Sequence, residues 1–134
     1  ESRIMNVRRI GYVGSLVARH GGIAICAPIA PYASTRAEVR AMAQAVGDFV
    51  LVHVNTPLAE CERRDLKGLY AKARAGLIPE FTGISDPYDE PLDADLRVDT
   101  STLTQDEAVA AVLDHLIAGG WVSPNTSTTT QRTS

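Results

Sequence analysis

The sequence has only two cysteines, no long apolar run and no excess of positive charge, and each absence excludes a class of protein. Cys26 and Cys61 fit no metal-site spacing, so we expect reduced thiols and a cytoplasmic protein. No apolar stretch approaches the roughly 18 residues of a membrane span, and nothing at the N-terminus resembles a signal peptide. The net charge of −3 gives no positive field for nucleic acid or an anionic membrane, so local basic clusters suit a small anionic ligand better.

What the sequence does contain is an alternation of helical and strand-like segments. Its 134 residues suffice for one domain with a hydrophobic core. Helical segments show apolar residues at three- and four-residue steps, and buried strands show short apolar runs. The predicted helices are residues 1–20, 35–46, 56–64, 67–75 and 104–118, and the predicted strands are residues 23–29, 49–54 and 95–98. This alternation predicts an α/β fold with a largely parallel sheet and right-handed crossovers.

Local signals mark where several of these segments begin and end. Two Thr-x-x-Glu patterns, starting at Thr35 and Thr104, match the capping box that opens a helix. Prolines and acidic residues over residues 85–93 predict a loop. The Ser/Thr-rich residues 123–134 predict a disordered tail, so we expect the domain to span residues 1–122.

The most informative stretch for function is a basic segment, residues 65–84, that ends beside an aromatic side chain. Lys67, Lys72 and Arg74 lie close together in it, and Phe81 follows after a turn. Such cations hold phosphate or sulfate oxygens and an exposed ring stacks on a base, as a phosphorylated nucleotide requires. The alternative is an ordinary solvated helix followed by a turn, because charged runs usually face water.

Lys-Gly-Leu-Tyr-Ala-Lys-Ala-Arg-Ala-Gly, starting at Lys67, and the later Phe-Thr-Gly-Ile, starting at Phe81, resemble the signature of adenylylsulfate (APS) kinases. These enzymes transfer the γ-phosphoryl group of ATP to the ribose 3′-hydroxyl of APS, which gives PAPS. In the family, the opening lysine and the closing phenylalanine contact APS, which implies that role for Lys67 and Phe81. The resemblance also implies a P-loop nucleoside-kinase-like sheet flanked by helices, ATP and Mg²⁺ as cofactors, and a homo-oligomer.

A second stretch of the resemblance lies at the N-terminus. Ser-Arg-Ile-Met-Asn-Val-Arg-Arg is similar to the family pattern Asp-Arg-x-Glu-Asn-Ile-Arg-Arg, in which the first arginine and the asparagine bind APS. This implies that Arg3 and Asn6 bind substrate. One helical turn separates them, so both reach one ligand, and an arginine grips phosphosulfate oxygens in bidentate fashion. Met5 and Ser2 depart from the family pattern, and the alternative is the basic face of an amphipathic helix.

A third stretch, Ala-Pro-Ile-Ala-Pro-Tyr, follows the first predicted strand and resembles the family's Ile-Ser-Pro-Tyr. The resemblance implies that Ile29 packs beside the adenine and that Ala30 lies near the substrate, where many relatives have serine. Direct in-line transfer needs no hydroxyl there. This variant looks more like kinase domains fused to ATP sulfurylase, which implies a fused or associated sulfurylase. Arg36, in the next helix, is a further candidate near the phosphosulfate.

The resemblance also implies a lid and an adenine site. P-loop kinases close a lid over ATP and bring cations onto the transferring phosphoryl group. Arg74 is the best lid candidate and, with Lys67, the expected catalytic residue, while Arg64 is expected to be a surface charge. In the family the segment after the last strand holds the ATP adenine, which implies Thr102 and Leu103 as cofactor-binding residues.

The sequence contains no Gly-x-x-x-x-Gly-Lys-Ser/Thr motif, which a P-loop kinase needs to cradle the ATP phosphates and hold Mg²⁺. The resemblance therefore covers the C-terminal two thirds of the family domain, and we expect the preceding third to be missing from this chain. The function we expect is that of an APS kinase, as part of a bifunctional ATP sulfurylase–APS kinase. The alternative is a non-catalytic regulatory domain of an ATP sulfurylase that binds PAPS; the intact Lys-Gly-Leu-Tyr pattern argues against it.

Overall fold

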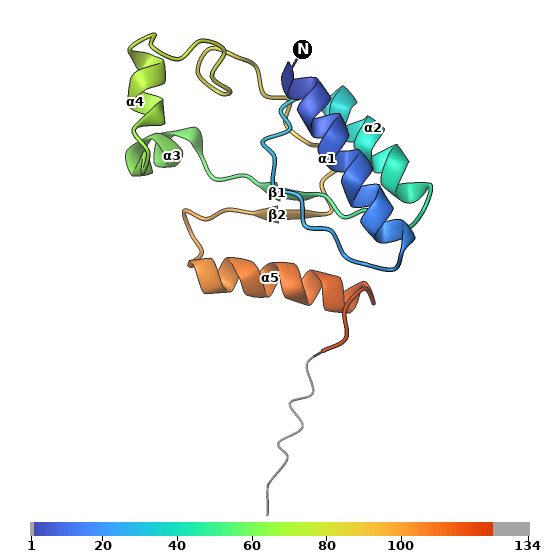
Figure 1. Ribbon diagram of the computed structural model, residues 1–134. Helices are drawn as coiled ribbons and strands as arrows, with labels where there is room; N and C mark the ends of the chain where they lie inside the picture. Colours follow the sequence, from blue (N-terminus) through green and yellow to red (C-terminus); the bar gives the residue numbers. More distant parts are fainter. Residues whose placement is uncertain (1, 125–134) are drawn as a thin grey trace, which may run out of the picture.

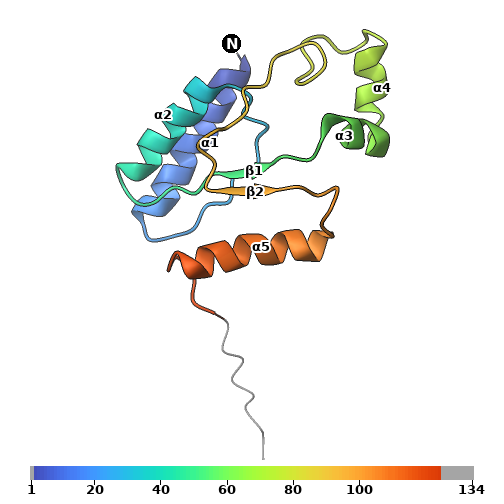
Figure 2. The ribbon, with the colours of Figure 1, turned by 180° about the vertical axis from the view of Figure 1, so that it is seen from behind.

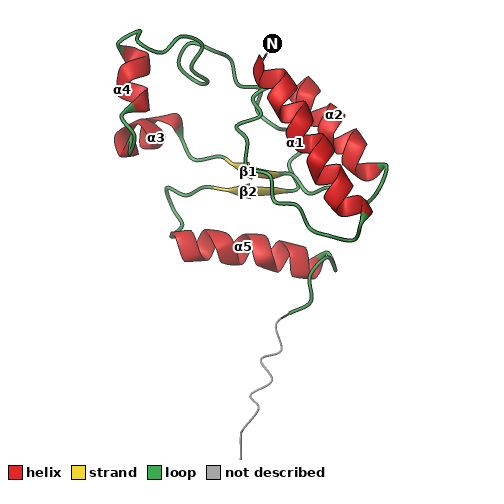
Figure 3. Ribbon diagram, viewed as in Figure 1, coloured by secondary structure: helices red, strands yellow, loops and turns green. Residues whose placement is uncertain are grey.

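A two-stranded parallel sheet separates a pair of helices from a single helix in the computed structural model, which describes residues 2–124 (Figure 1). The elements are, in order, α1 (Ser2–Arg19), α2 (Ala33–Gln44), β1 (Val52–Val54), α3 (Leu58–Arg64), α4 (Leu69–Arg74), β2 (Leu96–Val98) and α5 (Gln105–Ala118). The helices α1 and α2 lie on one side of the strands and α5 on the other, and the view from behind agrees (Figure 2). The short helices α3 and α4 stand to one side, followed by a long irregular segment (Figure 3).

The sheet is small and parallel. Val52 lies opposite Leu96 and Val54 opposite Val98, and each strand has three residues. Both strands are shorter than the predicted ranges, residues 49–54 and 95–98, because only the paired residues form a ladder. His53 is buried in β1, so the sheet interior includes a polar side chain. The predicted α/β class with a parallel sheet flanked by helices is confirmed.

The helix α1 confirms the predicted N-terminal helix and packs against α2. Its buried residues, Val7, Gly11 and Ser15, recur at four-residue steps on one face. A Cβ on Gly11 would lie 2.6 Å from Cγ2 of Val39, so glycine permits the close approach of the two helices here. Past its end, Gly21 takes a φ of 78°, the left-handed turn that the Gly-Gly pair predicted.

The predicted strand over residues 23–29 is wrong. Residues 23–29, which lie in the described part of the chain, form neither helix nor strand. Ile23, Ile25 and Ile29 are 64%, 93% and 68% exposed. Its apolar run signals a segment suited to burial, but a strand also needs a neighbour for its backbone hydrogen bonds. In the described part of the chain the sheet consists of β1 and β2 alone, and neither pairs with residues 23–29.

Of the two predicted capping boxes, one is confirmed and one is wrong. Thr104 caps α5: its Oγ1 accepts from the Glu107 amide at 3.2 Å, and the Glu107 carboxylate accepts from the Thr104 amide at 2.7 Å. α2 instead begins at Ala33, whose amide donates to the Asp89 carboxylate at 2.9 Å. Thr35 is buried in the first turn, and its Oγ1 has no hydrogen-bond partner. A distant loop residue therefore supplies what the local pattern assigned to Thr35.

The two predicted helices in the middle of the chain form, and both are shorter than predicted. The helices predicted over residues 56–64 and 67–75 appear as α3 and α4, and residues 85–93 contain no helix or strand. Of the predicted disordered tail, residues 125–134 lie outside the described part of the chain. None of the helices between residues 2 and 124 is long and apolar enough to cross a membrane.

Candidate functional site

A cavity of about 410 Å³ lies between the first half of α1 and the segment that leads into α2. It is lined by Arg3, Asn6, Val7, Ile10, Ala27, Pro28, Ile29 and Ala30. Four of these, Arg3, Asn6, Ile29 and Ala30, are residues that two separate sequence stretches implied for substrate binding. The fold therefore brings these two stretches to one cavity.

The guanidinium of Arg3 is held by the loop that carries Phe81. Nη1 of Arg3 donates to Oδ2 of Asp86 at 2.5 Å and to Oγ1 of Thr82 at 3.1 Å, and Nη2 donates to the Glu80 carbonyl at 2.7 Å. A guanidinium has five N–H donors, so these three bonds leave the Nε hydrogen and one Nη2 hydrogen for a ligand. Arg3 thus combines a fixed orientation with spare donors.

Asp86 is a residue of this site that the sequence analysis missed. Its Oδ2 accepts from Arg3 and also from the Tyr32 hydroxyl at 2.8 Å, and its side chain is 18% exposed. The hydrogen bond to Asp86 raises the pKa of Tyr32 above its ordinary value. No local spacing links Asp86 to Arg3, which lies 83 positions earlier in the sequence, so no sequence signal pointed to this contact.

The Arg36 side chain binds two backbone carbonyls and is not among the residues that line the cavity. This buried side chain donates to the Ala30 carbonyl at 2.8 Å and to the Asp89 carbonyl at 2.6 Å. Ala30 adopts a φ of 44°, which is unfavourable for a residue with a Cβ. Arg36 therefore stabilises the strained turn at the cavity wall, and its expected place near the phosphosulfate stays a prediction.

Lys67 and Phe81 do not line this cavity. Phe81 packs edge-on against Tyr70, with 5.1 Å between ring centroids, while its neighbours in the loop contact Arg3. Lys67 is exposed in the turn between α3 and α4. The carboxylate of Asp65 fixes that turn by accepting from two amides at the start of α4, which lowers the pKa of Asp65.

Arg74, the predicted lid residue, is paired with Glu62. Its Nη2 lies 2.7 Å from Glu62 Oε1, and its side chain is 60% exposed. The hydrogen bond that Arg74 donates to Glu62 raises the pKa of Arg74 above its ordinary value. In this structure the guanidinium therefore stabilises the contact between α3 and α4.

A second, more open cavity of about 680 Å³ lies between the sheet and α5. Its walls are mainly apolar, and they include Leu103 together with Thr100 and Arg64. Thr102, the other predicted adenine-binding residue, is not among its lining residues; its Oγ1 donates to the Asp99 carbonyl at 3.1 Å. Leu103 lines this cavity while its neighbour Thr102 does not, and the adenine site stays a prediction.

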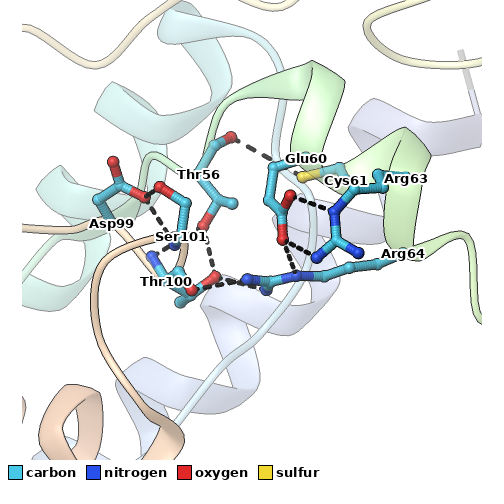
Figure 4. A network of polar contacts seen from close by, with 8 residues as sticks. All are labelled: Thr56, Glu60, Cys61, Arg63, Arg64, Asp99, Thr100 and Ser101. Carbon is cyan, nitrogen blue, oxygen red and sulfur yellow. Dashed lines mark hydrogen bonds and ion pairs between the residues drawn. The ribbon is translucent and has the colours of Figure 1, made fainter.

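A polar network joins α3 to the segment after β2 at the edge of the second cavity (Figure 4). Arg64 donates to Oγ1 of Thr100 at 2.9 Å and to its carbonyl at 2.7 Å. Glu60 accepts from Arg63 and Arg64, and these bonds lower the pKa of Glu60 to about 2. Arg64 is exposed, as expected of a surface charge, and its guanidinium also binds the Thr100 segment.

No group of three or more His, Cys, Asp or Glu side chains in the described range, residues 2–124, could hold a metal ion. The predicted Mg²⁺ therefore has no set of ligands in this part of the chain. Cys26 and Cys61 are free thiols.

Fold and cavities define an α/β protein with a small parallel sheet flanked by helices and with a cavity beside α1 that contains one arginine. The family profile described as adenylylsulphate kinase matches residues 1–99. The adenylyl-sulfate kinase of Picosynechococcus sp. is 46% identical over 124 residues, which is 92% of this chain and 68% of that protein. This chain belongs to the APS kinase family, a family of ATP-dependent transferases of sulfate assimilation, and the enzyme class expected from the sequence is confirmed.

The solved structures similar to this chain include two APS kinases. One is the Mycobacterium tuberculosis APS kinase CysC in complex with AMPPNP and APS, with a TM-score of 0.78 and 45% identity, covering 85% of this chain and 66% of that one. The other is the hexameric APS kinase from Thiobacillus denitrificans, with a TM-score of 0.63 and 39% identity, covering 90% of this chain and 18% of that one. This chain spans about two thirds of the length of the Picosynechococcus and M. tuberculosis kinases.

Proposed function

We propose that this chain contributes the APS-binding part of an APS kinase, which makes PAPS by transferring the γ-phosphoryl group of ATP to the 3′-hydroxyl of APS. The observation that carries the proposal is the cavity that gathers Arg3, Asn6, Ile29 and Ala30. Membership of the family supports it, and so does the similar M. tuberculosis kinase, whose structure holds APS and AMPPNP.

Each lining residue has a distinct task in the proposed site. The spare Nε and Nη2 hydrogens of Arg3 donate to phosphosulfate oxygens, and the Asn6 amide both donates and accepts. Ile29, which is 68% exposed, offers an apolar surface for the adenine. Ala30 contributes no hydroxyl, which suits direct in-line transfer, in which positioning and electrostatics provide most of the rate.

The roles of the residues outside this cavity are finer proposals that rest on the resemblance. Lys67 and Phe81 bind APS from the loop side, and the attachment of the Phe81 loop to Arg3 supports this. Arg74 acts on the transferring phosphoryl group after it leaves Glu62. Leu103, in the wall of the second cavity, contacts the ATP adenine together with Thr102. Mg²⁺ would be held mainly by residues that are absent from this chain.

Further proposals concern the context of the site. Ala-Pro-Ile-Ala-Pro-Tyr favours a kinase associated with an ATP sulfurylase, and it equally favours a second candidate function, a regulatory domain that binds PAPS without turnover. The hexameric relative supports a homo-oligomer. The two free thiols fit a cytoplasmic protein.

Binding is tested by titrating this chain with APS in a calorimeter, with AMP as the matched ligand that lacks the sulfate. We expect APS to bind more tightly than AMP. Arg3→Ala and Asn6→Ala should each weaken APS binding by about tenfold, the cost of losing hydrogen bonds to a charged group. Asp114→Ala, an exposed change on α5, is the control and should bind as the wild type does. Equal affinity for APS and AMP, or no effect of Arg3→Ala, would contradict the proposal.

Catalysis is tested with the protein at the length that its gene encodes, supplied with ATP, Mg²⁺ and APS. Formation of PAPS supports the kinase. Tight PAPS binding without any turnover identifies the regulatory candidate instead.

A further inference from the structure

One carboxylate oxygen joins three segments that carry the proposed APS contacts. Oδ2 of Asp86 accepts from Arg3 in α1 and from Tyr32 in the turn before α2, while Asp86 itself belongs to the Phe81 loop. Arg3 comes from the N-terminal stretch of the resemblance, and Tyr32 is the last residue of the Ala-Pro-Ile-Ala-Pro-Tyr stretch. Moving Asp86 would therefore change the relative position of all three segments.

The loop around Asp86 is built to transmit this position to Phe81. The Asp86 amide donates to the Phe81 carbonyl at 3.1 Å, and the Asp86 carbonyl accepts from the Gly83 amide at 2.9 Å. The Phe81 amide donates in turn to Oγ of Ser85 at 2.8 Å. Gly83 adopts a φ of 84°, which closes the turn at no steric cost to glycine. Residues 81–86 thus form one hydrogen-bonded turn whose outward anchor is the Asp86 carboxylate.

Asp86 has two possible effects on an anion at Arg3. It could compete with the ligand for the guanidinium, or it could hold the guanidinium in place for the ligand. The geometry favours the second, because Asp86 and Thr82 use only the Nη1 hydrogens, and the Glu80 carbonyl uses one at Nη2. Among residues 2–124, no acceptor binds the hydrogen at Nε or the second hydrogen at Nη2. Three acceptors from one loop fix the plane of the Arg3 guanidinium without exhausting its donors.

We propose that Asp86 is a positioning residue of the APS site, whose carboxylate orders Arg3, Tyr32 and the Phe81 loop before the nucleotide binds. This inference rests on the proposed function for its ligand. The ordering of the loop is a property of the free protein, so it is measured without any ligand.

The first measurement is hydrogen exchange of the free protein, followed by mass spectrometry of peptides that cover residues 77–92 and α5. Asp86→Ala should speed exchange in residues 77–92 by about tenfold and leave α5 unchanged, since it removes the anchor of that loop alone. Asp86→Asn keeps an acceptor for Arg3 and Tyr32, so it should restore most of the protection. Tyr32→Phe removes one of the two donors and should lie between wild type and Asp86→Ala.

The second measurement is APS affinity, and in the protein at its encoded length the KM for APS against the KM for ATP. Asp86→Ala should weaken APS binding by about tenfold and leave the KM for ATP unchanged, with Asp86→Asn again intermediate. Unchanged exchange in Asp86→Ala overturns the inference, as does APS binding that is unaffected or tighter, which would show competition. Failure of wild type to bind APS would refute the proposed function, and the exchange result would still decide whether Asp86 orders the loop.

Discussion

Replacing Gly11 by alanine tests the contact between α2 and α1, the helix that forms one wall of the proposed APS cavity. The added Cβ would lie 2.6 Å from Cγ2, 2.8 Å from Cγ1 and 3.1 Å from Cβ of Val39. Valine is stiff at χ1, and all three of its side-chain carbons are close, so a rotation cannot relieve the contact. The helices must separate instead, and Val7 on the same face of α1 would move with them.

Two opposing terms set the magnitude. Alanine improves helix propensity over glycine by about 1 kcal/mol, whereas overpacking of a well-packed contact costs about 1–3 kcal/mol. We expect Gly11→Ala to lower the free energy of unfolding by about 1 kcal/mol. Gly14→Ala on the same helix is the matched control: its Cβ would lie 3.3 Å from Sγ of Cys26, which is exposed and able to move, so the propensity gain should dominate.

Urea denaturation followed by circular dichroism measures both changes, and Gly11→Ala combined with Val39→Ala closes a double-mutant cycle. Removing the Val39 methyl groups should eliminate most of the cost of Gly11→Ala. The reasoning fails if Gly11→Ala is as stable as Gly14→Ala, or if Val39→Ala does not change the effect of Gly11→Ala.

The other predictions concern a cap, an ion-pair network and a buried arginine. Thr104→Ala should destabilise the protein by about 1 kcal/mol, whereas Thr35→Val should be neutral or stabilising because its buried hydroxyl has no partner; similar losses in both denaturation curves would contradict the structure. The folded-state pKa of Glu60 is about 2, below its ordinary 4.5, so its contribution is present above pH 4.5 and is lost as the pH falls toward 2; Glu60→Gln should therefore flatten the acid-unfolding curve in that window, and an unchanged slope would refute the assignment. Arg36→Lys should lower the free energy of unfolding by about 1–3 kcal/mol, since a lysine cannot reproduce a fork to two carbonyls; wild-type stability would show that the fork is dispensable.

Sequence patterns predicted the elements whose formation depends on near neighbours. The apolar spacing over residues 1–20 predicted a helix, which forms as α1, and the Thr104 box opens α5 as the spacing indicates. The cavity residues Arg3 and Ala30 also came from short stretches, and the fold brings them together. The helices form through interactions between residues a few positions apart in the sequence. The cavity residues were predicted from the resemblance to the family.

The errors have a common physical origin in distant partners. Ile25 belongs to an apolar run that reads as a strand, yet neither strand of the described sheet pairs with it, and it is 93% exposed. Thr35 has the spacing of a cap, but the carboxylate at the start of α2 comes from Asp89. The contact of Arg64 with Thr100 was also missed, because Thr100 lies 36 positions later in the sequence. No window of local sequence contains these partners.

The acidic loop between α4 and β2 shows how the two kinds of information combine. Its prolines and aspartates predicted an irregular segment, which is what forms, but its carboxylates also bind the neighbouring helices. Asp86 accepts from Tyr32 and Asp89 from the first amide of α2, while Asp93 pairs with Arg40 one further step along that helix. The loop is thus joined to α2 at successive positions, and Arg36 of the same helix binds the carbonyls of both Ala30 and Asp89. The composition therefore predicted a loop. It did not predict that successive acids of this loop bind residues at the start of α2 and along it, and these contacts hold the segment beside the proposed APS cavity in place.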